Sequence, residues 1–128
     1  MKIKISFLAI FSVLILSCNR SKSIEGFDQK LWKEDMNACK NLRVELVKVL
    51  LIKKEELKQF DDDAMIDLLG TPDKIRQFAR GEKNYIYFVQ SGSQCSEKTS
   101  SVKEGKKLVI EFDSVGEPKI IRESLLDR

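Results

Sequence analysis

The sequence predicts an α+β domain in which a long N-terminal helix and a short second helix pack on one face of a three- or four-stranded antiparallel sheet. Two observations predict this fold. Before Gly70 the apolar residues recur every three or four positions, and after Pro72 they form aromatic and β-branched runs or alternate with polar residues. Gly70 suits the left-handed position that follows a helix end, and Pro72 cannot continue a helix. The change from helical to strand period therefore falls here.

The long helix is expected over residues 29–54. Its apolar stripe is more typical of a core-facing helix than of a ligand site. The stripe consists of Trp32, Met36, Cys39, Leu42, Leu46 and Leu50. Because asparagine and cysteine are poor helix formers, the sequence also allows a break over residues 37–41.

The second helix is expected over residues 62–69. Asp61 is its N-cap, a position where a carboxylate accepts hydrogen bonds from free backbone amides, and the two aspartates that follow suit the positive end of the helix dipole. Phe60 and Met65 then occupy the positions of a hydrophobic staple. A metal site is the alternative interpretation of three consecutive aspartates, but the run lacks the alternate spacing and the glycine of a calcium loop.

Strands are expected in the second half of the chain. They cover residues 85–89, 108–112 and 119–122, and residues 75–79 can add a fourth. A glycine-containing turn joins the last two strands as an antiparallel hairpin. We expect Leu69, Ile110 and Phe112 to lie between the helices and the sheet. The polar segment 91–107 has no periodicity and predicts a long exposed loop.

The first 18 residues have the three-part layout of a secretory signal. Two lysines are followed by the apolar residues 5–16, which are too few for a membrane-spanning helix of about 20 residues. Residues 15–18, Ile-Leu-Ser-Cys, resemble the lipobox of bacterial lipoproteins, whose cysteine is acylated and becomes the first residue of the mature chain. We therefore expect lipidation of Cys18. An ordinary signal peptide or a buried cysteine is the alternative.

These features divide the chain into a signal peptide (1–17), a flexible tether (18–26) and a single domain (27–128). Removing the signal peptide removes two lysines and lowers the formal net charge from +3 to +1. The basic composition of the whole chain therefore does not indicate nucleic-acid binding.

Two cysteines remain after acylation of Cys18, and an even number of cysteines in an oxidising compartment is the usual sign of a disulfide. We expect a bond between Cys39 and Cys95. The alternative is a small buried Cys39 and an exposed thiol at Cys95.

Tyr85 and Tyr87 are candidate partner-binding residues. They point to the side of their strand opposite to Ile86 and Phe88, and exposed tyrosines are favoured at protein interfaces. The alternative is that the two tyrosines face the core, since both sides of this strand are apolar.

The sequence offers no catalytic constellation. It contains no histidine, so the usual general base near neutral pH and the commonest metal ligand are both missing. We expect neither an enzyme nor a bound metal or cofactor.

Four motifs in this order resemble the SmpA/OmlA lipoproteins, also called BamE. They are the lipobox, Leu-Gly-x-Pro at residues 69–72, Tyr-x-Tyr at 85–87, and Leu-x-Ile-x-Phe with a glycine turn at 108–116. The resemblance spans residues 60–121 and implies an ααβββ domain, similar also to one repeat of the β-lactamase-inhibitory proteins. Named members of the family are accessory subunits of the outer-membrane β-barrel assembly machinery. The first helix of this chain departs from the family by being much longer.

The resemblance implies a lipid-anchored, non-catalytic scaffold at the periplasmic face of the outer membrane, with barrel-assembly subunits as partners. Asn19 agrees with this location, because aspartate at that position signals inner-membrane retention in some bacteria. The alternative is an inhibitor or sequestering protein that binds a soluble periplasmic enzyme. The sequence leaves the partner and the oligomeric state open.

Overall fold

The structure is a computed structural model, and it describes residues 22–95 and 105–124. The predicted signal peptide (1–17), the predicted lipidation residue Cys18 and the middle of the predicted loop (96–104) lie outside the described residues. Within the described ranges, no helix has the length and apolar character needed to cross a membrane.

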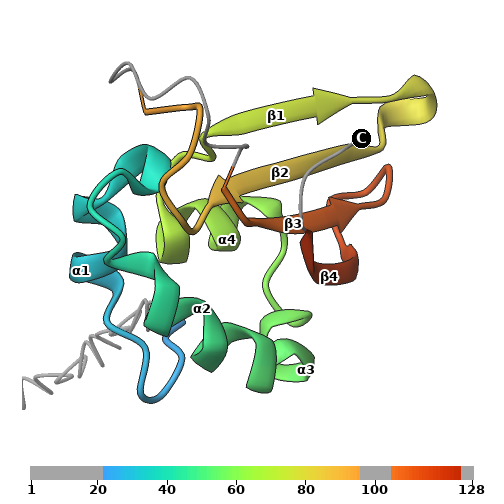
Figure 1. Cartoon of the computed structure of the whole chain (residues 1–128). Coiled ribbons are helices and arrows are strands. Elements are labelled where there is room, and N and C mark those ends of the chain that lie inside the picture. The colour runs from blue at the N-terminus through green and yellow to red at the C-terminus, as the bar shows by residue number, and fades with distance from the viewer. Residues whose placement is uncertain (1–21, 96–104, 125–128) are drawn as a thin grey trace, which may run out of the picture.

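The described chain folds as helices on one face of a four-stranded antiparallel sheet, which confirms the predicted α+β class (Figure 1). The helices are α1 (Gln29–Glu34), α2 (Arg43–Ile52), α3 (Lys54–Leu57) and α4 (Asp62–Leu69), with short 3₁₀ turns η1 (Met36–Ala38) and η2 (Ala79–Gly81). The strands are β1 (Lys74–Gln77), β2 (Lys83–Phe88), β3 (Lys107–Phe112) and β4 (Pro118–Ser124), adjacent in chain order. The predicted fourth strand is therefore present as β1.

The core lies between the helices and the inner face of the sheet. On that face Tyr85 pairs with Ile110 and Tyr87 with Leu108 across β2 and β3. All four side chains are buried, together with Trp32 from α1. The predicted core positions Leu69, Ile110 and Phe112 are likewise buried in this cluster, so that prediction is confirmed.

The predicted long helix is divided into shorter pieces. The break between α1 and α2 falls over residues 35–42, which include residues 37–41, where the sequence allowed a break. Asn37, Ala38 and Asn41 have φ values of 65°, 58° and 57° there, which no right-handed helix contains. The Asp35 carboxylate stabilises the break by accepting hydrogen bonds from the backbone amides of Lys40 and Leu42. The apolar stripe is consequently interrupted, and Met36 is 58% exposed.

Helix α4 begins and ends where the sequence predicts. The Asp61 side chain accepts a hydrogen bond from the amide of Ala64 at 2.8 Å and so caps the helix. Phe60 and Met65, at the staple positions, are both buried in the core. Gly70 follows the helix at a φ of 78°, which only glycine adopts without strain.

A buried ion pair connects the helices to the end of β2. The Arg43 guanidinium lies 2.7 Å from Asp73 Oδ2, and both side chains are almost fully buried. Arg43 also donates to the carbonyls of Trp32 and Phe88, while Asp73 accepts from the amides of Asn37 and Phe88. These partners satisfy two charges that would be costly to bury alone.

The second half of the predicted tether belongs to the domain. Ile24 is 3% exposed and lies in the core cluster, and the amide of Phe27 donates to its carbonyl. Lys22 reaches the Gln59 carbonyl at 2.9 Å. The prediction of a flexible tether through residue 26 is therefore wrong for residues 22–26. A single apolar residue in a polar stretch has no periodicity by which the sequence could reveal its burial.

Candidate functional site

The two predicted partner-binding tyrosines face the core, so the prediction that they form an exposed surface is wrong. Tyr85 and Tyr87 are 4% and 0% exposed. The Tyr85 ring packs in a tilted arrangement against Phe112, with ring centres 4.7 Å apart, and the Tyr87 hydroxyl donates to the Gly70 carbonyl at 2.9 Å. That carbonyl has no helical partner because it lies just past the end of α4. The hydroxyl therefore obtains its hydrogen bond inside the protein, where burial raises the pKa of Tyr87.

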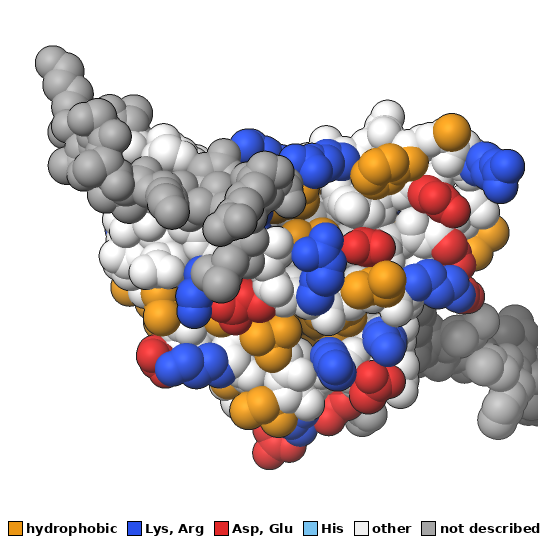
Figure 2. Space-filling view, turned by 45° about the vertical axis from the view of Figure 1, so that its right-hand side comes forward, with side chains coloured by type: hydrophobic (Ala, Val, Ile, Leu, Met, Phe, Trp, Pro, Cys, Tyr) orange, Lys and Arg blue, Asp and Glu red, His pale blue; other side chains and the backbone are white. Residues whose placement is uncertain are grey.

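The outer face of the sheet carries no helix within the described residues (Figure 1). Charged and hydrophobic side chains are interspersed on the surface seen in Figure 2. The buried and ionic contacts divide the outer face into two different halves. In the half nearer the C-terminal end of β2, Ile86, Phe88 and Val109 are buried. The ammonium groups of Lys74 and Lys107 lie 5.3 Å and 5.9 Å from the centre of the Phe88 ring. Charged side chains thus lie over apolar ones in this half.

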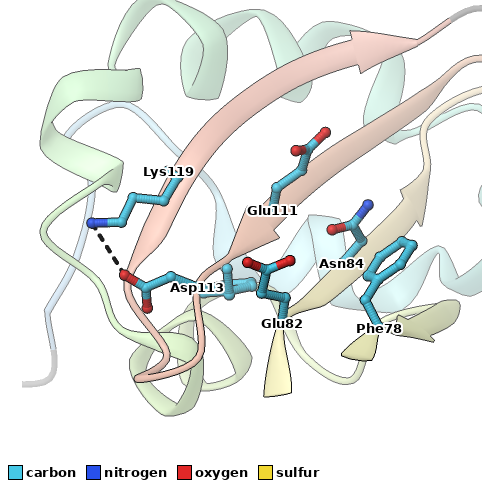
Figure 3. Close-up of a pocket in the computed structure, with 7 residues that line it drawn as sticks. Phe78, Glu82, Asn84, Glu111, Asp113 and Lys119 are labelled. Carbon is cyan, nitrogen blue, oxygen red and sulfur yellow. Dashed lines mark ion pairs between the residues drawn. The ribbon is translucent and has the colours of Figure 1, made fainter. Parts of the chain in front are cut away.

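The other half holds the hollow that is our candidate binding site (Figure 3). It has a volume of about 420 Å³. Its lining residues come from β2, β3 and β4 and from the turns on either side of β2 and β3 that join them to their neighbours: Phe78, Glu82, Asn84, Glu111, Phe112, Asp113 and Lys119.

The sheet register brings the polar lining residues together. Asn84 on β2 is the direct partner of Glu111 on β3, so both side chains point outward side by side (Figure 3). Glu82 and Asp113 are each two residues further along, toward the turns, where alternate residues share a face of the sheet. The hollow is therefore lined by three carboxylates and one amide.

Turn residues complete the rim of the hollow. The amide of Phe78 donates to the Glu82 carbonyl at 2.8 Å, which closes the β1–β2 hairpin and places the half-exposed Phe78 ring beside Asn84. Arg80, at a φ of 70°, and Gly81, at 79°, turn the chain there. On the opposite side, Asp113 Oδ1 accepts from the amides of Val115 and Glu117 and so shapes the β3–β4 turn.

The charges of the hollow are partly neutralised from β4. Lys119 Nζ lies 3.1 Å from Asp113 Oδ2, and Arg122 Nε lies 3.3 Å from Glu111 Oε1. The backbone hydrogen bond from Glu117, with a smaller contribution from Lys119, lowers the pKa of Asp113. Its side-chain hydrogen bond to Asp113 raises the pKa of Lys119. The Glu82 carboxylate is exposed at the open side of the hollow. This arrangement can accept hydrogen bonds from a partner and offer it an aromatic contact.

The sequence pattern did not predict the hollow. A usable signal was present, because Glu82 and Asn84 on one strand and Glu111 and Asp113 on the next are polar residues spaced two apart. Polar alternation of this kind is also normal for any solvated face, so it does not distinguish a binding surface from an ordinary one.

The predicted disulfide is present. Cys39 in the break between α1 and α2 is bonded to Cys95, which follows β2, with the two Cα atoms 5.7 Å apart. The disulfide lies near the C-terminal end of β2, and the hollow lies near its N-terminal end. The two cysteines are therefore not part of the candidate binding site.

Among the described residues, no three cysteine or carboxylate side chains gather in a way that could hold a metal ion. Comparison of the chain with protein-family models, curated proteins and solved structures finds no match.

Proposed function

We propose that this chain is a lipid-anchored, non-catalytic protein-binding module of the bacterial cell envelope, facing the periplasm from the outer membrane. The proposal rests on the hollow in the helix-free outer face of the sheet. It combines a half-exposed phenyl ring with carboxylates and an amide, the mixture of apolar and polar groups found in protein interfaces.

Two features support the compartment. The first 18 residues have the layout of a lipoprotein signal, and the Cys39–Cys95 bond is of the kind that forms outside the cytoplasm. The proposal that the partners are barrel-assembly subunits rests on the motif resemblance alone.

The anchor is tested with Cys18→Ser. We expect this variant to stay unprocessed or free of lipid label, whereas the wild type incorporates labelled fatty acid and fractionates with the outer membrane. The control is Cys95→Ser, which keeps the signal sequence intact. Normal lipid labelling of Cys18→Ser would refute the anchor.

A periplasmic inhibitor is the second candidate function, and the β1–β2 hairpin favours it. The hairpin projects beyond the helices in Figure 1, every residue of β1 is exposed, and Phe78 lies near its tip. A projecting hairpin with an exposed aromatic residue suits insertion into the cleft of a soluble enzyme.

Co-purification after mild detergent extraction distinguishes the two functions. Recovery of membrane-protein assembly subunits supports the scaffold, and recovery of one soluble enzyme supports the inhibitor. In either case the double variant Phe78→Ser, Glu82→Lys should lose the partner. Ile52→Ser is the matched control, because it removes an apolar side chain that is 81% exposed on α2, away from the sheet. Equal capture by both variants would refute binding at the hollow.

A further inference from the structure

The Cys39–Cys95 disulfide joins two segments that other contacts already hold together. The amide of Ser91 donates to Asn41 Oδ1 at 2.8 Å, and Gln94 Nε2 donates to the Asn37 carbonyl at 3.0 Å. Both hydrogen bonds run between the segment after β2 and the α1–α2 break, and neither involves a sulfur atom. The two cysteines are therefore held adjacent by groups other than the bond itself.

The α1–α2 break is itself fixed without the disulfide. The buried Asp35 carboxylate accepts from the amides of Lys40 at 2.9 Å and Leu42 at 2.8 Å. From the other side, Asp73 Oδ1 accepts from the Asn37 amide at 3.0 Å. Because Asp35 and Asp73 hold this backbone, opening of the S–S bond leaves the position of Cys39 defined.

The surroundings also suit the dithiol form. The Asn37 carbonyl oxygen lies 3.7 Å from the sulfur of Cys39 and 4.0 Å from that of Cys95, within reach of a thiol proton on either residue. Gln94 Oε1 is buried and accepts no hydrogen bond. Ala38, next to Cys39, has a φ of 58°, a conformation that an alanine adopts only under constraint.

The two cysteine residues differ in exposure. Cys39 is exposed to solvent, whereas Cys95 is partly covered. Exposed disulfides are generally the labile ones, because a thiolate can reach one sulfur without unfolding of the protein.

We propose that Cys39–Cys95 is an exchangeable disulfide, opened and re-formed by an external dithiol while the domain stays folded. The thiolate of the dithiol attacks Cys39 Sγ, the S–S bond breaks, and Cys95 leaves as a thiolate that takes a proton from water. The second thiol of the dithiol then displaces Cys39 from the mixed disulfide. The protein ends with two thiols and the reagent with one disulfide, so the exchange is reversible and follows the thiol balance of its compartment.

The test is equilibration of the full chain with defined mixtures of reduced and oxidised dithiothreitol, without denaturant. Alkylation and peptide mapping then report the thiol content of Cys39 and Cys95 separately from Cys18, and circular dichroism reports folding. We expect both thiols to become alkylated with an unchanged dichroism spectrum, and the bond to re-form as the mixture is made oxidising. A bond that opens only with unfolding would overturn the proposal.

Two variants test whether the hydrogen bonds hold the thiols together. Asn41→Gly and Gln94→Ala each remove one hydrogen bond between the two segments and should shift the equilibrium toward the dithiol by about 2- to 10-fold. Glycine is used at residue 41 because its φ of 57° would strain an alanine. Ser93→Ala, an exposed position in the same segment, should shift it less than twofold. Shifts equal to that of Ser93→Ala would overturn the proposal. The double variant Cys39→Ser, Cys95→Ser should keep the dichroism spectrum of the folded protein. An unfolded double variant would also overturn the proposal.

Discussion

The two ends of strand β2 are built differently. At its C-terminal end, Phe88 is tied to the helices through the buried Arg43–Asp73 pair, and the disulfide follows within a few residues. At its N-terminal end, the strand continues from the projecting β1–β2 hairpin beside an open hollow, and its ion pair with helix α4, Lys83–Asp62, is partly exposed. Strand β2 therefore connects the sheet to the helices at its C-terminal end and borders a candidate interaction surface at its N-terminal end.

The same comparison extends to the ion pairs at the two ends. The Arg43–Asp73 pair is almost completely buried, whereas Lys83 and Asp62, which pair at the hairpin end, remain 26% and 23% exposed. When one member of a buried pair is removed, the remaining charge stays buried without solvation, which is costly. When one member of a partly exposed pair is removed, the remaining charge can be hydrated, so the cost is small. Four predictions follow this difference, from the largest expected effect to the smallest.

The largest effect is expected for Asp73→Ala. The change leaves the Arg43 guanidinium buried without its counter-charge and removes the acceptor of two backbone amides. We expect a loss of about 3 to 5 kcal/mol in the free energy of unfolding, measured by urea titration.

The control is Glu45→Ala, which breaks an exposed pair with Lys48 and should cost less than about 0.5 kcal/mol. The double variant Arg43→Met, Asp73→Leu should recover part of the loss, because no unpaired charge stays buried. Equal losses in Asp73→Ala and Glu45→Ala would show that the two ends of β2 do not differ.

Next is Phe112→Ala, on the inner face near the hollow. Phe112 is 3% exposed and packs against Tyr85, so its truncation should cost about 3 kcal/mol, the lower part of the range for a buried phenylalanine. The lower value is expected because Phe112 is the last residue of β3, where the neighbouring turn can relax around the shortened side chain. Thermal melting measures the effect, with Ile120→Ala on the outer face as the control. An unchanged midpoint for Phe112→Ala would place this side chain outside the core.

The helix boundaries show where the sequence was informative. Asp61, Gly70 and Pro72 act through local backbone chemistry, so the ends of α4 could be predicted from neighbouring residues alone. The α1–α2 break depends instead on Asp35 accepting amides five and seven residues away. The apolar spacing through Met36 and Cys39 suits a continuous helix equally well, and only the folded arrangement decides between them.

The sequence also could not show which face of β2 packs on the helices, or that Arg43 and Asp73 form a buried pair. Tyr85 and Ile86 are both apolar enough to be buried, and both are buried, so alternation gave no direction. Arg43 and Asp73 stand 30 residues apart, and each resembles a surface charge until the fold brings them together. The disulfide was predictable because it required only a count of cysteines and a compartment.

The third prediction concerns the pH dependence of the Lys83–Asp62 pair. The hydrogen bond from Lys83 lowers the pKa of Asp62, and the hydrogen bond to Asp62 raises the pKa of Lys83. The pair therefore stabilises the fold above the unfolded carboxyl pKa of about 4 and below the unfolded lysine pKa of about 10.4. Below about pH 4 its contribution is lost as Asp62 takes up a proton at its lowered pKa.

Lys83→Met should lower stability by about 0.5 to 1 kcal/mol at pH 7. The difference from the wild type should stay constant between pH 5 and 9 and shrink toward pH 2. Lys58→Met, which breaks an exposed pair with Glu55, is the control. A difference that persists unchanged at pH 2 would mean that Lys83 contributes through packing on Tyr85 instead of through Asp62.

The smallest effect on stability is expected at the hollow itself. Phe78 is 50% exposed and Glu82 lies open to solvent, so the double variant Phe78→Ser, Glu82→Lys should change the free energy of unfolding by less than about 0.5 kcal/mol. If this variant keeps near-native stability but no longer captures the partner, the hairpin end of β2 functions in binding and contributes little to stability. If the same variant lost more than about 2 kcal/mol, the hollow would be part of the structural framework, and the two ends of β2 would be alike. Urea titration and the capture experiment on one preparation decide between these outcomes.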